Sequence, residues 1–182
     1  MAVKHIKNFL YLIVQNYRRK KLDSCGKNVF IGKGVLSGHI ELGSNISIGT
    51  GAWFVSTRAK IIVHDNVVFA PNVTVYTGNH ITNCIGKHIS EISDEEKDKS
   101  SVVWDKDVVI ESGCWIGTRA IILKGVTIGK GSIIGAGAIV TKDVPPYSIY
   151  VGVPQQRIIR RFSDEEIKAH ETILKERGIP IQ

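Results

Sequence analysis

Cysteine is scarce in this 182-residue chain, and so are proline and the aromatic residues. The three cysteines, Cys25, Cys84 and Cys114, include no Cys-x-x-Cys pair, so the pattern is neither that of a disulfide scaffold nor that of a zinc knuckle. An odd number of isolated cysteines favours a reducing cytoplasm. Five prolines beside 18 glycines, with 7% aromatic residues, predict many tight turns and few large rings in the core.

Long apolar runs are also absent. Residues 9–14 form the longest apolar run near the start, and they are far too few to cross a bilayer. Basic residues follow this run and no small-residue cleavage site is present, so we expect no signal peptide. With 43% hydrophobic and 23% charged residues, the composition excludes the disordered classes and fits one domain with a sizeable core.

The positive charge is concentrated in two places. The net charge is +7, and residues 1–22 carry six cations and no acid. Arg157, Arg160 and Arg161 form a second basic cluster near the other end. A nucleic-acid-binding surface would spread its charge along a face and interleave it with aromatic residues, so we expect two local anionic partners and no nucleic acid.

A six-residue repeat dominates the second half of the chain. No α-helix has this period and a strand alone has period two, so the repeat predicts short strands with two inward side chains, each followed by a corner. A β-sandwich would show turn signals every 8–12 residues without an unbroken period. We therefore predict an all-β parallel β-helix. The six-spaced positions are Ile110, Ile116, Ile122, Ile128, Ile134 and Val140, and the positions two before them are Val108, Cys114, Ala120, Val126, Ser132 and Ala138.

The first half keeps the register less regularly. Leu42, Ile48 and Phe54 are six apart, and a second set begins nine residues later at Val63, which predicts a bulge between the two sets. From Val75 to Trp104 the step is 29, which predicts an insertion.

Helices are expected at both ends of the β-helix. Residues 3–20 have apolar residues at helical spacing: Ile6, Phe9, Leu10, Ile13 and Tyr17. Residues 163–177 open with a capping box made by Ser163 and Glu166. We divide the chain into a basic amphipathic helix (1–24), a β-helix (25–150) with an inserted catalytic loop (78–102), and a C-terminal basic segment with its helix (151–182).

Residues 28–162 resemble the hexapeptide-repeat acyltransferases, whose β-helix is left-handed with three hexads per coil. The segment Ala70–Val75 resembles the maltose and galactoside O-acetyltransferases, and Gly78-Asn79-His80 resembles the xenobiotic acetyltransferases. This resemblance implies that His80 is the general base and that Tyr76 and Asn79 bind the acceptor. Most lone histidines are structural, but this one opens a long loop on a rigid scaffold, and an imidazole suits the removal of a proton from a hydroxyl.

The same resemblance implies an acetyl-CoA site. Residues 114–118 and 135–146 look like the family's coenzyme A stretch, and Gly152-Val153-Pro154 looks like its terminal Gly-x-Pro segment. The implied cofactor-binding residues are Trp115, Thr118, Ala136, Thr141, Lys142, Arg157 and Arg160. Cys114 falls in the inward column and there is no nucleophile motif, so we expect direct attack in a ternary complex without an acyl-enzyme. No metal is expected.

The predicted function is acetyl-CoA-dependent O-acetylation of a sugar hydroxyl in surface polysaccharide biosynthesis, since the basic N-terminal helix makes the chain similar to capsule and O-antigen acetyltransferases. An amino-sugar amine or a xenobiotic acceptor stays open. Two other classes are a zinc lyase similar to the γ-carbonic anhydrases, which would need His64, His80 and His88 to converge, and a structural prism without activity.

The expected assembly is a homotrimer with its sites between subunits, as in the family, because apolar residues such as Tyr76 and Trp104 are expected on the outer faces of the prism. The N-terminal segment, residues 3–21, has two alternative roles. It either lies on the inner membrane surface or against a lipid-linked acceptor, as a peripheral contact of a cytoplasmic protein, or only caps the first coil. The expected acceptor is a small-molecule or lipid-linked sugar.

Overall fold

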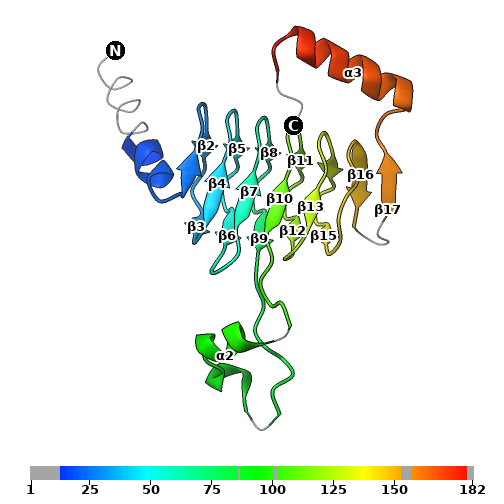
Figure 1. The fold of residues 1–182 in the computed structure, drawn as a ribbon. Helices are drawn as coiled ribbons and strands as arrows, with labels where there is room; N and C mark the ends of the chain where they lie inside the picture. Colours follow the sequence, from blue (N-terminus) through cyan, green and yellow to red (C-terminus); the bar gives the residue numbers. More distant parts are fainter. Residues whose placement is uncertain (1–12, 86, 101, 153–156, 180–182) are drawn as a thin grey trace.

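The chain folds as a left-handed parallel β-helix of about six turns, as the hexad repeat and the family resemblance predicted. The computed structural model describes residues 13–179 except 86, 101 and 153–156. Each coil contributes one short strand to each of three faces, and every strand is parallel to the strands stacked on it until the final pair (Figure 1). The coils stack from the N-terminal helix toward the C-terminal hairpin.

The three faces are three sheets whose members recur at every third strand. Face one contains β1 (Ser24–Cys25), β4 (Ile40–Leu42), β7 (Ile61–Val63), β10 (Val108–Ile110) and β13 (Thr127–Ile128). Face two contains β2 (Phe30–Ile31), β5 (Ser47–Ile48), β8 (Val68–Phe69), β11 (Trp115–Ile116), β14 (Ile133–Ile134), β16 (Ser148–Val151) and β17 (Arg157–Arg160). Face three contains β3 (Val35–Ser37), β6 (Trp53–Val55), β9 (Thr74–Tyr76), β12 (Ile121–Ile122) and β15 (Ile139–Val140).

The inward columns predicted from the repeat form the core. Both positions of each hexad are buried in both halves of the chain, and Cys114 and Ser132 are buried among the aliphatic residues. Phe54 and Phe69, on consecutive coils, meet edge to face with ring centres 5.1 Å apart. Because the column is continuous across the insertion, β10 stacks directly on β7 although 44 residues separate Val63 and Val108.

Asparagine and glycine recur at the corner between faces one and two, and the backbone conformation of this corner explains why. One residue per coil has a left-handed backbone there, and asparagine and glycine adopt it most readily. The exception is Tyr147 (φ 52°), whose ring covers Gly131 and whose hydroxyl donates to Glu171. Burial, followed by the Glu171 contact, raises the pKa of Tyr147 to about 12. The corner residues are Asn28, Asn45, Asn66, Gly113, Gly131 and Tyr147.

The expected helices precede and follow the prism in the chain, and the second one lies back along the corner between faces one and two, where Glu171 contacts Lys130 and Tyr147. Residues 13–19 are helical, and the rest of the predicted 3–20 helix toward the start lies outside the described residues. After the prism, α3 (Asp164–Glu176) begins with the predicted capping box of Ser163 and Glu166. Before it, β17 turns back antiparallel on β16, a strand that the hexad pattern does not predict.

No helix in the described part of the chain has both the length and the apolar character needed to cross a bilayer.

Candidate active site

The inserted loop leaves the prism after β9 and returns at β10, and a short antiparallel neck holds its two ends together. Gly78 bridges Asp105, the Asn79 N–H donates to the carbonyl of Trp104 (3.1 Å), and the Lys106 N–H donates to the carbonyl of Thr77 (2.8 Å). His80 is the first residue beyond this neck. The neck therefore fixes the backbone that carries His80 to the rigid coil.

Gly78 is required at the neck because the Asp105 carboxylate lies against it. A Cβ at this position would come 1.8 Å from Asp105 Oδ1. The Asp105 side chain is only 9% exposed and accepts from Lys97 Nζ at 2.7 Å, and Arg58 lies 4.0 Å away. Gly78, two residues before His80, therefore leaves room for the Asp105–Lys97 ion pair, which links the neck to the loop.

The loop contains two short helical segments that were not expected: η1 (Ile89–Glu91) and α2 (Asp94–Lys99). The signal for α2 is the capping box of Ser93 and Glu96, the same pattern that identified the C-terminal helix. Arg58 anchors α2 to the prism through Asp94 (3.2 Å) and Asp98 (3.5 Å). The predicted nine-residue step between Phe54 and Val63 contains Arg58, so this bulge supplies the anchor.

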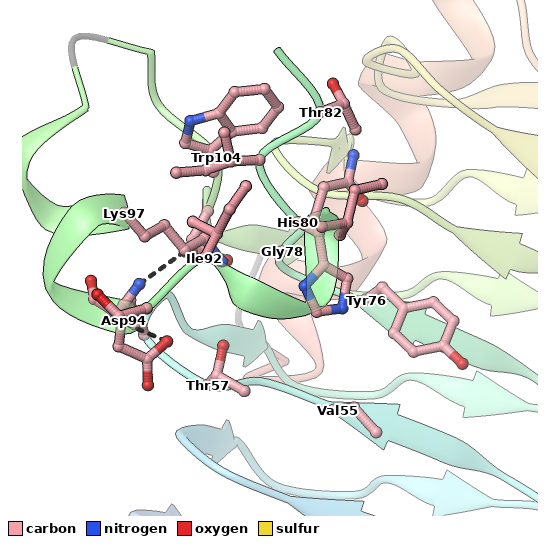
Figure 2. Close-up of a pocket in the computed structure, with 16 residues that line it drawn as sticks. Val55, Thr57, Tyr76, Gly78, His80, Thr82, Ile92, Asp94, Lys97 and Trp104 are labelled. Carbon is pink, nitrogen blue, oxygen red and sulfur yellow. Dashed lines mark hydrogen bonds and ion pairs between the residues drawn. The ribbon is translucent and has the colours of Figure 1, made fainter. Parts of the chain in front are cut away.

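A cavity of about 830 Å³ lies between the loop and face three (Figure 2). It gathers the three residues predicted for catalysis and acceptor binding, Tyr76, Asn79 and His80. The His80 imidazole is exposed and has no hydrogen bond to any other described residue, so it is open to a ligand. The remaining walls mix apolar side chains with hydroxyls and charges: Val55, Thr57, Arg58, Ile81, Thr82, Ile89, Ile92, Ser93, Asp94, Lys97, Trp104 and Asp105, with Gly78 at the neck.

Trp104 is a correction to the sequence interpretation. It was expected on an outer face of the prism, but it lies on the returning side of the loop and lines the cavity. Its Nε1 donates to Ser100 Oγ at 2.9 Å, and Lys124 Nζ lies 5.5 Å from the ring centre. Trp104 does not belong to the hexad repeat, because the prism resumes only at Val108.

The predicted cofactor residues lie elsewhere on the prism. Thr118 and Ala136 are exposed at the corner between faces two and three on consecutive coils, and the Gly137 N–H donates to the Thr118 carbonyl at 2.8 Å. Thr141 and Lys142 are exposed just after β15, at the corner from which the loop emerges. None of the seven predicted cofactor residues, all described by the structure, lines the His80 cavity of the same chain.

The remaining three cofactor candidates lie on face two. Trp115 of β11 is 52% exposed on the outer side of this face. Arg157 and Arg160 begin and end β17. The Arg160 side chain bonds the Asp164 carboxylate and the Phe162 carbonyl. Val153 and Pro154 of the Gly-x-Pro segment lie outside the described residues.

The backbone between Trp115 and Thr118 contains an available donor. The Gly117 N–H is occupied, because it donates to the Ile134 carbonyl at 2.7 Å. The Thr118 N–H has no acceptor among the described residues, although its hydroxyl donates to the Pro71 carbonyl at 2.7 Å. An exposed, unoccupied backbone donor of this kind can stabilise an oxyanion.

Cys114 has the environment of a core residue. It is 2% exposed, its Sγ donates to the Gly129 carbonyl at 3.3 Å, and burial raises the pKa of its thiol to about 12. A thiol must be deprotonated to act as a nucleophile. Cys114 therefore stays in the unreactive protonated form at any pH well below 12.

We predict that iodoacetamide at mildly alkaline pH leaves Cys114 unmodified in the folded protein, and that Cys114→Ala keeps turnover within a factor of a few. The half-exposed Cys84 of the loop serves as the internal reference for labelling. Peptide mass mapping before and after denaturation measures the labelling. Modification of Cys114 in the native state, together with loss of turnover in the alanine variant, would contradict this.

Metal-ligating side chains do not cluster within residues 13–179, leaving aside the gaps at 86, 101 and 153–156. No three His, Cys, Asp or Glu side chains in this part are placed so that they could hold a metal ion.

Comparison with known proteins gives consistent matches. The family described as bacterial transferase hexapeptide (six repeats) matches residues 107–142. A galactoside O-acetyltransferase of Escherichia coli is 35% identical over 134 residues, which cover 70% of this chain and 60% of that protein. A putative acetyltransferase of Saccharomyces cerevisiae is 31% identical over 153 residues, or 81% of this chain and 70% of that protein.

A solved structure agrees with these matches. A galactoside acetyltransferase in complex with coenzyme A aligns with a TM-score of 0.64 at 30% identity, covering 82% of this chain and 70% of that one. The match to the Escherichia coli relative extends over only 60% of the relative's length.

Proposed function

The chain belongs to the hexapeptide-repeat transferase family, and from this premise we propose that it is an acetyl-CoA-dependent O-acetyltransferase acting on a sugar hydroxyl. The observation that carries the proposal is His80. Its imidazole is exposed in a cavity of about 830 Å³, on a backbone that the loop neck fixes to the coil. The family relatives include a galactoside O-acetyltransferase.

In the proposed reaction His80 acts as the general base. The neutral imidazole takes the proton of the acceptor hydroxyl while its oxygen attacks the carbonyl carbon of the thioester. The tetrahedral intermediate collapses with cleavage of the C–S bond, and the imidazolium returns its proton to the departing thiolate. The products are an acetyl ester and free coenzyme A. No covalent acyl-enzyme forms, in agreement with the burial of Cys114.

The other parts of the reaction are assigned to the residues of the coenzyme A stretch. The Thr118 N–H is the oxyanion donor. Small residues at the same corner let the pantetheine arm approach the backbone: a Cβ on Gly137 would meet nothing within 4 Å, so there is open space beside it. Lys142, Arg157 and Arg160 bind the phosphates, since charge-assisted bonds to phosphate are strong.

The acceptor is proposed to be an uncharged or weakly charged sugar unit of a surface polysaccharide precursor. The cavity offers aromatic and aliphatic walls from Tyr76, Ile92 and Trp104 beside the hydroxyls of Thr57 and Thr82. Arg58 and Lys97, the cations of the cavity wall, already pair with Asp94 and Asp105. This combination suits the apolar face and the hydroxyls of a sugar ring better than a highly charged acceptor.

A screen of acetyl-CoA consumption tests the proposal. Release of free thiol is measured with simple glycosides, nucleotide sugars, lipid-linked sugars, amino sugars and chloramphenicol as acceptors. We expect the highest kcat/KM with a sugar hydroxyl. Preference for an amino sugar or chloramphenicol would replace the acceptor while keeping the reaction class, and absence of thiol release with every acceptor would contradict the proposal.

The active unit is proposed to be a homotrimer with sites between subunits. Faces two and three have exposed apolar side chains on their outer sides, which a neighbouring subunit would cover: Phe30, Val68 and Trp115 on face two, and Val35, Trp53 and Ile139 on face three. The separation of Thr118 and Ala136 from the His80 cavity of the same chain supports a site completed by a neighbour. Closed symmetry leaves no such face uncovered.

Complementation tests the shared site. His80→Ala and Ala136→Trp should each be inactive. Mixed trimers refolded from equal amounts should regain about a quarter of the wild-type rate, because about one interface in four joins a subunit with an intact His80 to a neighbour with an intact Ala136. Light scattering establishes the mass of each preparation. A fully active monomer, or inactive mixtures of correctly assembled trimers, would contradict the shared site.

A further inference from the structure

The N-terminal helix has two faces with different roles. Its polar face holds the first coil: Gln15 is 3% exposed and exchanges two hydrogen bonds with the backbone of Ile31, at 2.9 and 3.1 Å. Arg18 donates to the same Ile31 carbonyl, and Arg19 donates to the Val29 carbonyl at 3.1 Å. These bonds satisfy backbone groups at the open end of face two.

The opposite face of this helix is apolar and exposed. Ile13, Val14 and Tyr17 are 49%, 43% and 61% exposed, and none of them belongs to the core cluster of the described residues. Residues 13 and 17 continue the spacing of Ile6, Phe9 and Leu10 in the sequence. Capping of the coil and contact with an apolar environment are therefore compatible, because they use opposite faces.

This end of the molecule is also strongly basic. Residues 1–40 contain eight cations and one acid, so they account for the whole net charge of +7. Lys20, Lys21, Lys27 and Lys33 are exposed, and the one acid, Asp23, is 3.1 Å from His39. Exposed lysines beside an exposed apolar helix face are the combination that binds an anionic lipid surface.

We propose that the apolar face of residues 13–17, with the surrounding lysines, docks this end of the prism on a membrane surface rich in anionic lipids. The docking is peripheral: the side chains of Ile13, Val14 and Tyr17 enter the headgroup boundary and the lysines contact the lipid phosphates. The role does not depend on the proposed catalytic activity.

Charge favours a lipid surface over a second copy of the chain. A copy seated on this face by two-fold symmetry would bring two identical basic ends together, and like charges in contact oppose association. An anionic membrane instead offers negative charge to the exposed lysines of this end. Lys21 Nζ already lies 4.8 Å from the centre of the Tyr17 ring, so charge and apolar surface are adjacent within one turn of the helix.

Vesicle flotation tests the docking. Full-length protein is mixed at low ionic strength with phosphatidylcholine vesicles that contain or lack phosphatidylglycerol, and the bound fraction is measured. We expect binding only to the anionic vesicles. K20Q/K21Q should weaken it about 30-fold, at about fivefold per charge. I13S/Y17S should weaken it about tenfold or more, since two apolar side chains lose their burial.

A matched control is Ile173→Ser on α3, which removes a similarly exposed (54%) isoleucine far from the helix and should bind like the wild type. Light scattering follows the mass of every variant. Two results would overturn the proposal: no binding of the wild-type protein to anionic vesicles, or binding that is unaffected in I13S/Y17S protein of unchanged mass.

Discussion

His80→Ala is expected to lower turnover by about 10²–10⁴-fold while leaving the KM for acetyl-CoA nearly unchanged. The imidazole is exposed in the cavity beneath the loop, and none of the predicted cofactor residues of the same chain lines that cavity, so we expect its loss to remove the proposed base and leave donor binding intact. Steady-state kinetics with both substrates varied separates kcat from each KM.

Two other histidines serve as controls for this prediction. His88 belongs to the same loop, where its backbone N–H is held by Glu91, and it does not line the cavity. His64 lies at a corner of face one, away from the loop. His88→Ala and His64→Ala should each keep turnover within a factor of a few. Equal losses in His80→Ala and His88→Ala would indicate that the loop needs both side chains for structure, and the base would have to be sought elsewhere.

Removing one of the cations proposed to bind phosphate is expected to raise the KM for acetyl-CoA about tenfold to a hundredfold with little change in kcat. The variants are Lys142→Ala, Arg157→Ala and Arg160→Ala. Arg160 is held by Asp164 and by the Phe162 carbonyl, so its guanidinium is already oriented before a phosphate binds. The wild-type KM should also rise with salt, because ions screen exposed charges.

Lys168→Ala is the matched control for the cations. Lys168 is exposed on α3 and has no assigned role in donor binding, so its removal should leave the KM for acetyl-CoA unchanged. An unchanged KM in all three test variants would mean that the phosphates bind elsewhere on the protein.

Local periodicity explains why the prism could be predicted from the sequence. Each hexad places two side chains inward, so the burial of Ile116 or Val126 can be predicted from its position in the hexad alone. The position of His80 in the cavity was predictable for a different reason: the break in the period after Val75 marks an insertion, and His80 stands where this insertion begins. The capping box of α3 is likewise local.

Contacts between segments that are distant in the sequence could not be predicted from local sequence patterns. Arg58 lies in an irregular step of the repeat, and its role appears only when α2 folds back onto it. The strand β17 exists because it pairs with β16, and its residues are all exposed, so it has no alternating pattern to detect. The helix stripe of Ile13 and Tyr17 predicted burial or docking, but only the bonds of Gln15 reveal which face meets the coil.

The most direct test of the central claim follows the acetyl group itself. Labelled acetyl-CoA is incubated with the protein and the best sugar acceptor, and the label is located by mass spectrometry of the acceptor, free coenzyme A and the intact protein. The proposed mechanism predicts one base-labile ester on the sugar for each coenzyme A released, no label on the protein, and no transfer by His80→Ala. Label covalently held by the protein, or transfer at the wild-type rate by His80→Ala, would contradict it.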